Sequence, residues 1–150
     1  FRSVEIVSQE APVFEEKEAD IVLIPGVEGM MGVLPNHAPV LTQLGFGELI
    51  VRKGNAEEIF AIYGGVVEIR PDKIVVLADM AESAFALNSE AAEQARANAE
   101  QRLAEGVPPD QRREAALSLR RANLELRLSR KLKQRSHVLR ILSEDEDNGR

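Results

Sequence analysis

Few residues in this chain are able to do acid–base or metal chemistry. Its two histidines, His37 and His137, are far apart in the sequence, and there is no cysteine to serve as a thiol nucleophile or thiolate ligand. The acidic pairs Glu15–Glu16 and Glu57–Glu58 fall in predicted strands, where adjacent side chains point to opposite faces and do not converge on one substrate. We therefore expect no catalytic residue, no bound metal and no cofactor.

Cationic side chains form the second chemically notable group. Ten residues between Arg112 and Arg140 are basic and only two are acidic, whereas residues 1–84 contain 14 acidic and 6 basic residues. A basic helix attached to an acidic domain predicts binding to an acidic partner, either a protein or a nucleic acid. All six aromatic residues lie outside this helix, which weakens the nucleic-acid hypothesis because no ring is available there to stack on bases.

The densest local pattern runs from Gly26 to Pro39, with the sequence GVEGMMGVLPNHAP. Gly29 and Gly32 permit turns with positive φ, and prolines stiffen the path on either side of His37. The pattern predicts a rigid loop that displays contacts. His37 serves either an interface or a local carbonyl group, and Met30–Met31 forms either an exposed contact surface or the rim of the domain.

The elements that position these residues follow from composition. Eight of the ten glycines lie in the first 65 residues, between short β-branched runs. These runs predict strands over residues 4–7, 12–15, 19–26, 46–52, 58–63, 66–70 and 73–78, with turns at 53–55, 64–65 and 71–72. We interpret Gly64–Gly65 as a tight turn, because no helix N-terminus follows that could bind phosphate. The first half is thus a β-sandwich or flattened barrel.

The second half is predicted to be helical. Ser89 is the expected cap of a first helix that ends at Gly106, and Asp110 is the expected cap of a second helix reaching Leu142. Residues 112–142 as helix would extend about 46 Å and residues 89–105 about 25 Å, so about 20 Å of the second helix would lack a partner in the hairpin. The fold class is α+β: an N-terminal β-sandwich (1–84) followed by an antiparallel two-helix hairpin (85–150), with a solvated acidic tail at 144–150.

The glycine-rich run also carries a family resemblance. Gly29, Gly32, Pro35, His37 and Pro39 match a Gly-x-x-Gly-x-x-Pro-x-His-x-Pro pattern, and the likeness continues through residues 44–49, 63–71 and 75–81. The chain closely resembles the epsilon subunit of F-type ATP synthase over its whole length. The resemblance implies a non-catalytic rotor subunit in the central stalk of a proton- or sodium-translocating synthase, coupling the catalytic head to the c ring.

The resemblance also implies partners. The sandwich would bind the gamma subunit and the c-subunit ring, with Gly29, Met30, Met31, Gly32 and His37 at the c-ring interface. Relatives often have an acidic residue where this chain has Met30, which puts an ionic contact there in question. The helices would reach the alpha and beta subunits of the catalytic head and inhibit ATP hydrolysis. The basic face expected to do so comprises Arg120, Arg121, Arg127, Arg130, Lys131, Lys133 and Arg135.

One departure from the family pattern concerns the binding of nucleotide. ATP-binding relatives carry Ile/Leu-Asp-x-x-Arg-Ala at the start of the first helix, and this chain keeps Leu87 and Ala92 but has Asn88 and Ala91 in place of the Asp and the Arg. We therefore expect weak ATP binding or none. No apolar run approaches the roughly 18 residues of a membrane span, so we expect a soluble protein peripheral to the cytoplasmic face of a bacterial inner membrane, with organellar origin left open. The alternative hypothesis is an adaptor that binds nucleic acid or another partner through the basic helix.

Overall fold

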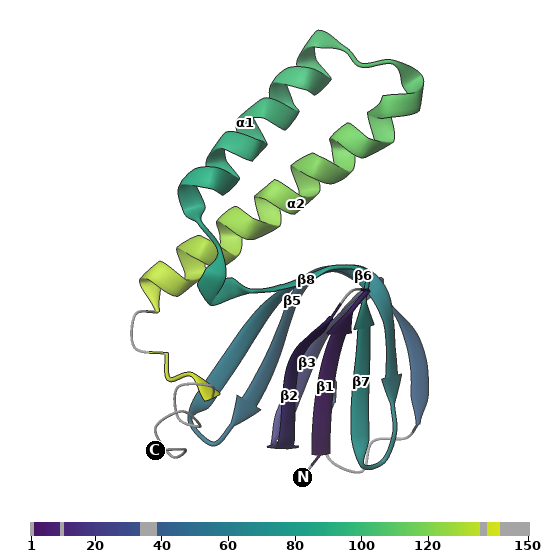
Figure 1. Cartoon of the computed structure of the whole chain (residues 1–150), viewed down its shortest axis with the longest axis vertical. Helices are drawn as coiled ribbons and strands as arrows, with labels where there is room; N and C mark the ends of the chain where they lie inside the picture. The colour runs from purple at the N-terminus through teal and green to yellow at the C-terminus, as the bar shows by residue number, and fades with distance from the viewer. Residues whose placement is uncertain (1, 10, 34–38, 136–137, 142–150) are drawn as a thin grey trace. The chain divides into compact units, whose positions relative to one another are not determined.

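The computed structural model describes residues 2–9, 11–33, 39–135 and 138–141 (Figure 1). The chain forms two compact units, one of Phe1–Ser83 with His137–Arg150 and the other of Ala84–Ser136. The first unit is the β-sandwich and the second is the helical hairpin. Eight strands build the sandwich: β1 (Arg2–Ser8), β2 (Pro12–Ala19), β3 (Ile21–Gly26), β4 (Gly29–Val33), β5 (Val40–Lys53), β6 (Ala56–Ile69), β7 (Lys73–Ala78) and β8 (Ala81–Ser83).

Two 14-residue strands, β5 and β6, hold the sandwich together. They pair antiparallel from Val40↔Ile69 to Lys53↔Ala56, and the strand order is β2-β1-β7-β6-β5-β3-β4, with β8 also on β6. The last part of β6 pairs with β7, whereas its first part pairs with β8, and β3 pairs with the later part of β5. The two long strands therefore belong to both layers, and the sandwich is one continuous sheet folded over on itself.

The bend in β6 lies at Gly64–Gly65, and this corrects the predicted tight turn. Gly65 has φ +127°, and a Cβ added to it would lie 2.2 Å from the carbonyl oxygen of Leu77. Only glycine permits this backbone and this close approach to β7. The two glycines bend one continuous strand where it passes from one layer to the other, instead of separating two strands.

The core consists of the inward-facing residues of both layers. Val4, Ile6, Val22 and Ile24 are almost wholly buried, and they alternate with more exposed neighbours along β1 and β3. The rings of Phe14 on β2 and Phe60 on β6 lie 5.1 Å apart between centroids, joining the layers. The predicted strands at 4–7 and 12–15 and the turns at 53–55 and 71–72 are confirmed.

The second unit contains a short 3₁₀ helix, η1 (Ala84–Ala86), and two helices, α1 (Ser89–Glu105) and α2 (Pro109–Gln134), which pack as an antiparallel hairpin. Ala92 and Ala99 are buried on α1, and Ala115 and Ala122 on α2. Small side chains on both helices allow a close approach. Further buried positions on α2 are Leu124, Leu126 and Leu128.

The helix caps differ from the prediction. Asn88, not Ser89, caps α1, because its Oδ1 accepts hydrogen bonds from the backbone N–H groups of Glu90 (2.9 Å) and Ala91 (3.1 Å). The N-cap of α2 is Pro108, with no side-chain hydrogen bond, so Asp110 instead lies in the first turn. Gly106 ends α1 with φ +89°, as predicted.

The second helix is shorter than predicted. It ends at Gln134, so its 26 residues extend about 39 Å and exceed the 17-residue α1 by about 14 Å, not 20 Å. Leu139 lies outside the helix and forms an isolated bridge with Ala56 of the sandwich. Leu142 and residues 144–150 lie outside the described residues. The structure groups residues 138–141 with the first unit, whereas the prediction placed all of residues 85–150 in the second.

The bend at Gly65 yields a stability prediction. We expect Gly65→Ala to lower the free energy of unfolding by about 3 kcal/mol or more, because the new Cβ meets backbone and the φ is unfavourable for alanine. Gly54→Ala is the matched control, since Gly54 also has positive φ (+58°) but has no neighbouring atom within 4 Å of the added Cβ. It should cost about 1 kcal/mol. Denaturant unfolding of the full chain measures both, and equal losses would contradict the close approach.

Candidate functional site

The tip of the β3–β4 hairpin carries most of the predicted c-ring contacts. Gly26 pairs with Gly29 across a two-residue turn, and β4 pairs with β3 alone among the described strands. Met30 is 54% exposed, whereas Met31 is partly buried and packs against the core. Met30 is therefore available for contact, and Met31 anchors the strand.

Two details of the predicted contact loop change. Gly29 has the expected positive φ (+133°), but Gly32 does not, because it lies within β4 as ordinary strand. The segment is an edge strand up to Val33 rather than a loop. Pro35 and His37 lie outside the described residues.

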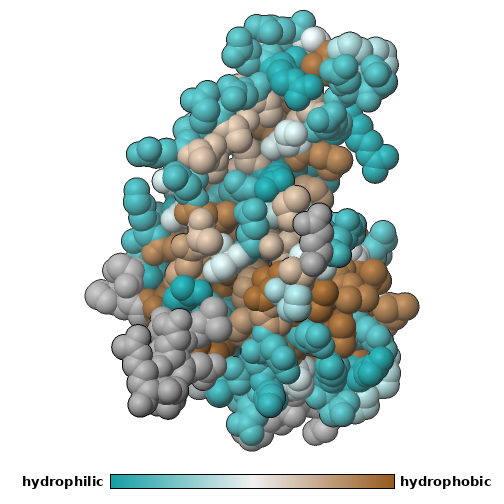
Figure 2. Space-filling view, in the orientation of Figure 1, coloured by the Kyte–Doolittle hydropathy of each residue, from teal (hydrophilic) through white to brown (hydrophobic). Residues whose placement is uncertain are grey.

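Sequence reasoning missed several exposed apolar side chains on the sandwich. Val27, at the β3–β4 turn next to Met30, is 58% exposed. A second group lies on the outer face of β5, β6 and β7: Val66 pairs with Leu77, and Leu41 lies diagonally across from Val66. Along β6 and β7, the exposed Val66 and Leu77 are next to the buried Val67 and Val76. This alternation between the two faces of a strand is the signal that could have identified the exposed residues. Figure 2 shows hydrophobic surface gathered on the sandwich, whereas most of the visible hairpin is hydrophilic.

The predicted basic face of α2 divides into two groups. Arg120, Arg127 and Lys131 share one face of the helix because they are seven and four residues apart, and Arg113 extends the same row by a further seven. The side chains of Arg113, Arg120 and Arg127 are exposed, and that of Lys131 is half-buried. We call Arg113, Arg120, Arg127 and Lys131 the cation row.

The other predicted basic residues lie off this row. Arg121 pairs with Glu125 within α2 at 2.9 Å, and Arg130 reaches Glu93 of α1 at 3.5 Å. Lys133 is exposed in the last turn, and Arg135 is the C-cap, whose backbone N–H donates to carbonyl groups of the last turn. The seven residues therefore do not form a single face.

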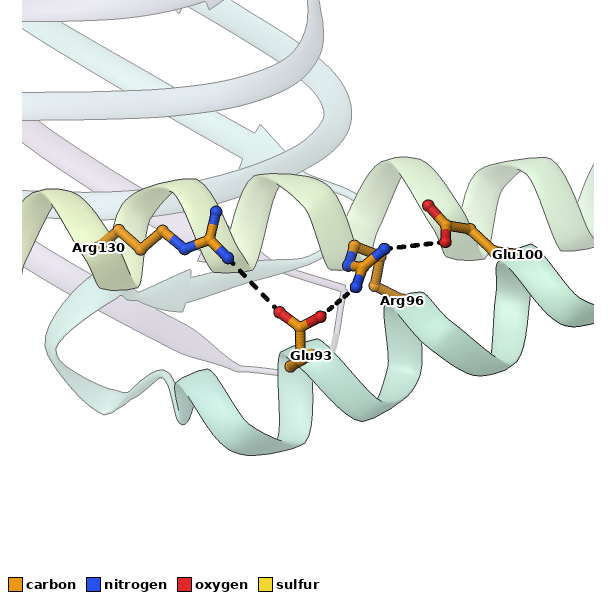
Figure 3. Close-up of polar contacts among 4 residues, drawn as sticks. All are labelled: Glu93, Arg96, Glu100 and Arg130. Atoms are coloured by element: carbon orange, nitrogen blue, oxygen red, sulfur yellow. Dashed lines mark hydrogen bonds and ion pairs between the residues drawn. The ribbon is translucent and has the colours of Figure 1, made fainter.

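Glu93 is the centre of an ion cluster between the two helices (Figure 3). Arg96 of α1 pairs with Glu93 and also with Glu100, at 2.9 Å, while Arg130 approaches Glu93 from α2. The hydrogen bond from Arg96 holds the pKa of Glu93 below its ordinary value, and the charge of Arg130 acts in the same direction. The same carboxylates raise the pKa of Arg96.

Two of the residues that align with the ATP-binding pattern of relatives, Asn88 and Ala92, take part in capping and packing of α1. Asn88 accepts hydrogen bonds from the N–H groups at the start of α1, and Ala92 is buried on α1. An open groove between the helices has a volume of about 680 Å³, and its lining includes Arg96, Arg127 and Arg130. Two of these cations already have carboxylate partners, which opposes binding of a further anion.

The acidic pairs do not converge, as predicted. Glu57 pairs with Arg52 at 2.7 Å, whereas the adjacent Glu58 is buried and pairs with Arg140 at 2.7 Å. Glu15 is exposed and Glu16 is buried. Within the described ranges, no cluster of three or more acidic or histidine side chains is able to hold a metal ion.

Comparison with known proteins identifies the family. The model of the ATP synthase delta/epsilon chain β-sandwich domain matches residues 2–84. The chain belongs to the ATP synthase epsilon-chain family. An ATP synthase epsilon chain of Dehalococcoides mccartyi is 41% identical over 136 residues, which cover 90% of this chain and 96% of the relative. The epsilon chain of Herpetosiphon aurantiacus is 40% identical over 127 residues, which cover 85% and 93%.

Solved structures show the same fold. A chain in the cryo-EM structure of the Euglena gracilis mitochondrial ATP synthase OSCP/F1/c-ring superposes with a TM-score of 0.72 at 20% identity, over 80% of this chain and 76% of that one. A chain of the Tetrahymena thermophila mitochondrial ATP synthase central stalk/c-ring gives 0.60 at 11% identity, over 85% and 96%. The predicted fold and family are confirmed, and this chain is a non-catalytic epsilon-family subunit of ATP synthase.

None of the helices in the described segments is long and apolar enough to cross a membrane.

The ion cluster at Glu93 yields a titration prediction. The Glu93 carboxyl should have a pKa below its ordinary value in wild type and a higher pKa in Arg96→Ala, because the hydrogen bond from Arg96 is lost. Arg130→Ala should move it less. With the folded-state pKa depressed, the cluster stabilises the hairpin above the unfolded-state pKa and loses that effect as pH falls through the folded-state pKa. NMR titration of the Glu93 side-chain carbon measures this, and an unchanged midpoint in Arg96→Ala would contradict it.

Proposed function

We propose that the sandwich of this epsilon-family chain binds the gamma subunit and the c ring, and that its hairpin restrains ATP hydrolysis through the catalytic head. The observation that carries the proposal is the alignment with an ATP synthase epsilon chain over 136 residues, through both sandwich and hairpin. In this assignment the complex is peripheral to the membrane, on the cytoplasmic face of a bacterial inner membrane.

The two apolar surfaces of the sandwich suit two different contacts. Val27 and Met30 form a small exposed tip, suited to touching the loops of a ring through a methionine that adapts to its neighbours. Leu41, Val66 and Leu77 form a flat patch across three strands, typical of a surface covered by a protein partner. We assign the tip to the c ring and the patch to the gamma subunit.

The cation row supports the inhibitory role of the hairpin. Arg113, Arg120, Arg127 and Lys131 form a line along α2 that is suited to contacts with acidic segments of the alpha and beta subunits. Arg121 and Arg130 lie off this line, and they pair with Glu125 and Glu93. Each exposed pair is worth only about 0–1 kcal/mol, so the row acts by number and geometry.

The test removes the cation row from the assembled synthase. Replacement of Arg113, Arg120, Arg127 and Lys131 together by Ala should raise the ATP hydrolysis rate several-fold at low salt, because four attractive contacts with the catalytic head are lost. Assembly should be unchanged, since the sandwich holds the other partners. The measurement is ATP hydrolysis by complexes with verified stoichiometric incorporation.

A matched control removes the same charge elsewhere in the hairpin. Arg102, Arg112, Arg121 and Lys133 replaced together by Ala also lose four positive charges, but these residues lie off the row. Hydrolysis should stay near the wild-type rate. Equal activation by both variants would show that net charge acts instead of the row, and no activation by the row variant would contradict inhibition.

A second prediction concerns ATP. The free chain should show no micromolar ATP binding in a calorimetric titration, because Asn88 already caps α1 and Arg96 and Arg130 are paired with Glu93. Glu93→Ala releases Arg130 and removes one of the two carboxylate partners of Arg96, so it should strengthen any residual binding. Micromolar affinity in wild type would overturn this prediction.

A further inference from the structure

The chain returns to the sandwich after α2. Leu139 lies beside Ala56 at the start of β6 in a parallel bridge, and the Glu57 backbone N–H donates a hydrogen bond of 2.7 Å to the Leu139 carbonyl oxygen. The Leu139 side chain is 62% exposed, so this residue contributes its backbone. Addition of a segment to a strand through main-chain hydrogen bonds is a recurrent mode of peptide recognition.

The next residue supplies a specific anchor. The Arg140 guanidinium donates two hydrogen bonds to Oε1 of Glu58, from Nη2 at 2.7 Å and from Nε at 3.2 Å. Glu58 is 0% exposed and lies on the same side of β6 as Ala56 and Phe60, both members of the core. A buried carboxylate is costly unless it is paired, so the cation that the C-terminal segment brings lowers the cost of burying this inward-facing glutamate.

The third contact is apolar. Ile141 is 0% exposed and belongs to the same hydrophobic core as Val4, Phe14 and Phe60. The segment therefore combines a backbone pairing, a buried ion pair and a buried aliphatic side chain within three consecutive residues.

We propose that residues 138–141 are a latch that holds the C-terminal end of the hairpin at the sandwich, and that Arg140 must leave Glu58 before that end moves away. The link from Gln134 to Val138 is four peptide steps, which reach about 14 Å at most. While the latch is closed, the end of α2 stays tethered within that reach. As a control on inhibition the latch rests on the proposed function, because extension of the hairpin toward the catalytic head requires its release.

The first test measures latch opening in the free full-length chain. Arg140→Ala and Ile141→Asp should accelerate hydrogen exchange at the Glu57 amide on the order of 100-fold, because each removes a buried contact that holds Leu139 in place. Leu139→Ala is the matched control and should leave exchange unchanged, since the exposed side chain is not used. Wild-type exchange as fast as in Arg140→Ala would overturn the latch.

A chain ending at Arg135 is a second variant, which removes Arg140 and Ile141 together and opens Glu58 to water. It should exchange at Glu57 as fast as the opened latch. Protection at the wild-type level in this shortened chain would equally overturn the proposal.

The second test measures release of the hairpin. The chain contains no cysteine, so spin labels at Asp72→Cys on the sandwich and Glu105→Cys on α1 report a single distance distribution. That distribution should broaden in Arg140→Ala and stay as in wild type in Leu139→Ala. Identical distributions in wild type and Arg140→Ala would show that the segment does not restrain the hairpin. Hydrogen exchange and the spin-label distances are both measured on the free chain. A negative result in them would contradict the latch, whereas a negative result in the ATP hydrolysis test would contradict inhibition.

Discussion

The continuous pairing of β5 with β6 is the constraint on which the rest of this molecule depends. Each strand belongs to both layers, so the register set at the Lys53–Ala56 turn fixes which residues face the core at the far end, near Val40 and Ile69. A slip by one residue would turn the buried face outward in both layers at once. The exposed tip at Met30 and the patch at Val66 and Leu77 keep their positions because β3 and β7 pair with these two strands.

Much of this architecture was predictable because short-range patterns encode it. Short β-branched runs between glycine-containing turns indicated most strands, and the loss of glycine from the second half indicated the hairpin. The bend at Gly64–Gly65 was not predictable, since a glycine pair between two β-branched runs is also typical of a tight turn. The bend is distinguished from a tight turn by the close approach of the β7 backbone, which would lie 2.2 Å from a Cβ added to Gly65.

The errors at the helix ends have a related cause. Leucines continue at helical spacing as far as Leu142 in the sequence, so periodicity alone predicts a second helix that is too long. Its true end depends on contacts of the C-terminal residues with β6, which are distant in sequence. The candidate site shows the same limit: cationic residues on α2 were visible, but only the positions of Glu93 and Glu125 show that Arg130 and Arg121 have partners inside the hairpin.

The placement of Ile141 in the sandwich core has a consequence for biosynthesis. In the sequence, the hairpin interrupts the sandwich. Residues before it and residues after it contribute to one core. Domains generally fold from the N-terminus during translation, yet this one lacks a core side chain, Ile141, until the hairpin has been translated. The nascent sandwich would therefore emerge from the ribosome with Glu58 uncovered, and it would be completed only after the hairpin had been made.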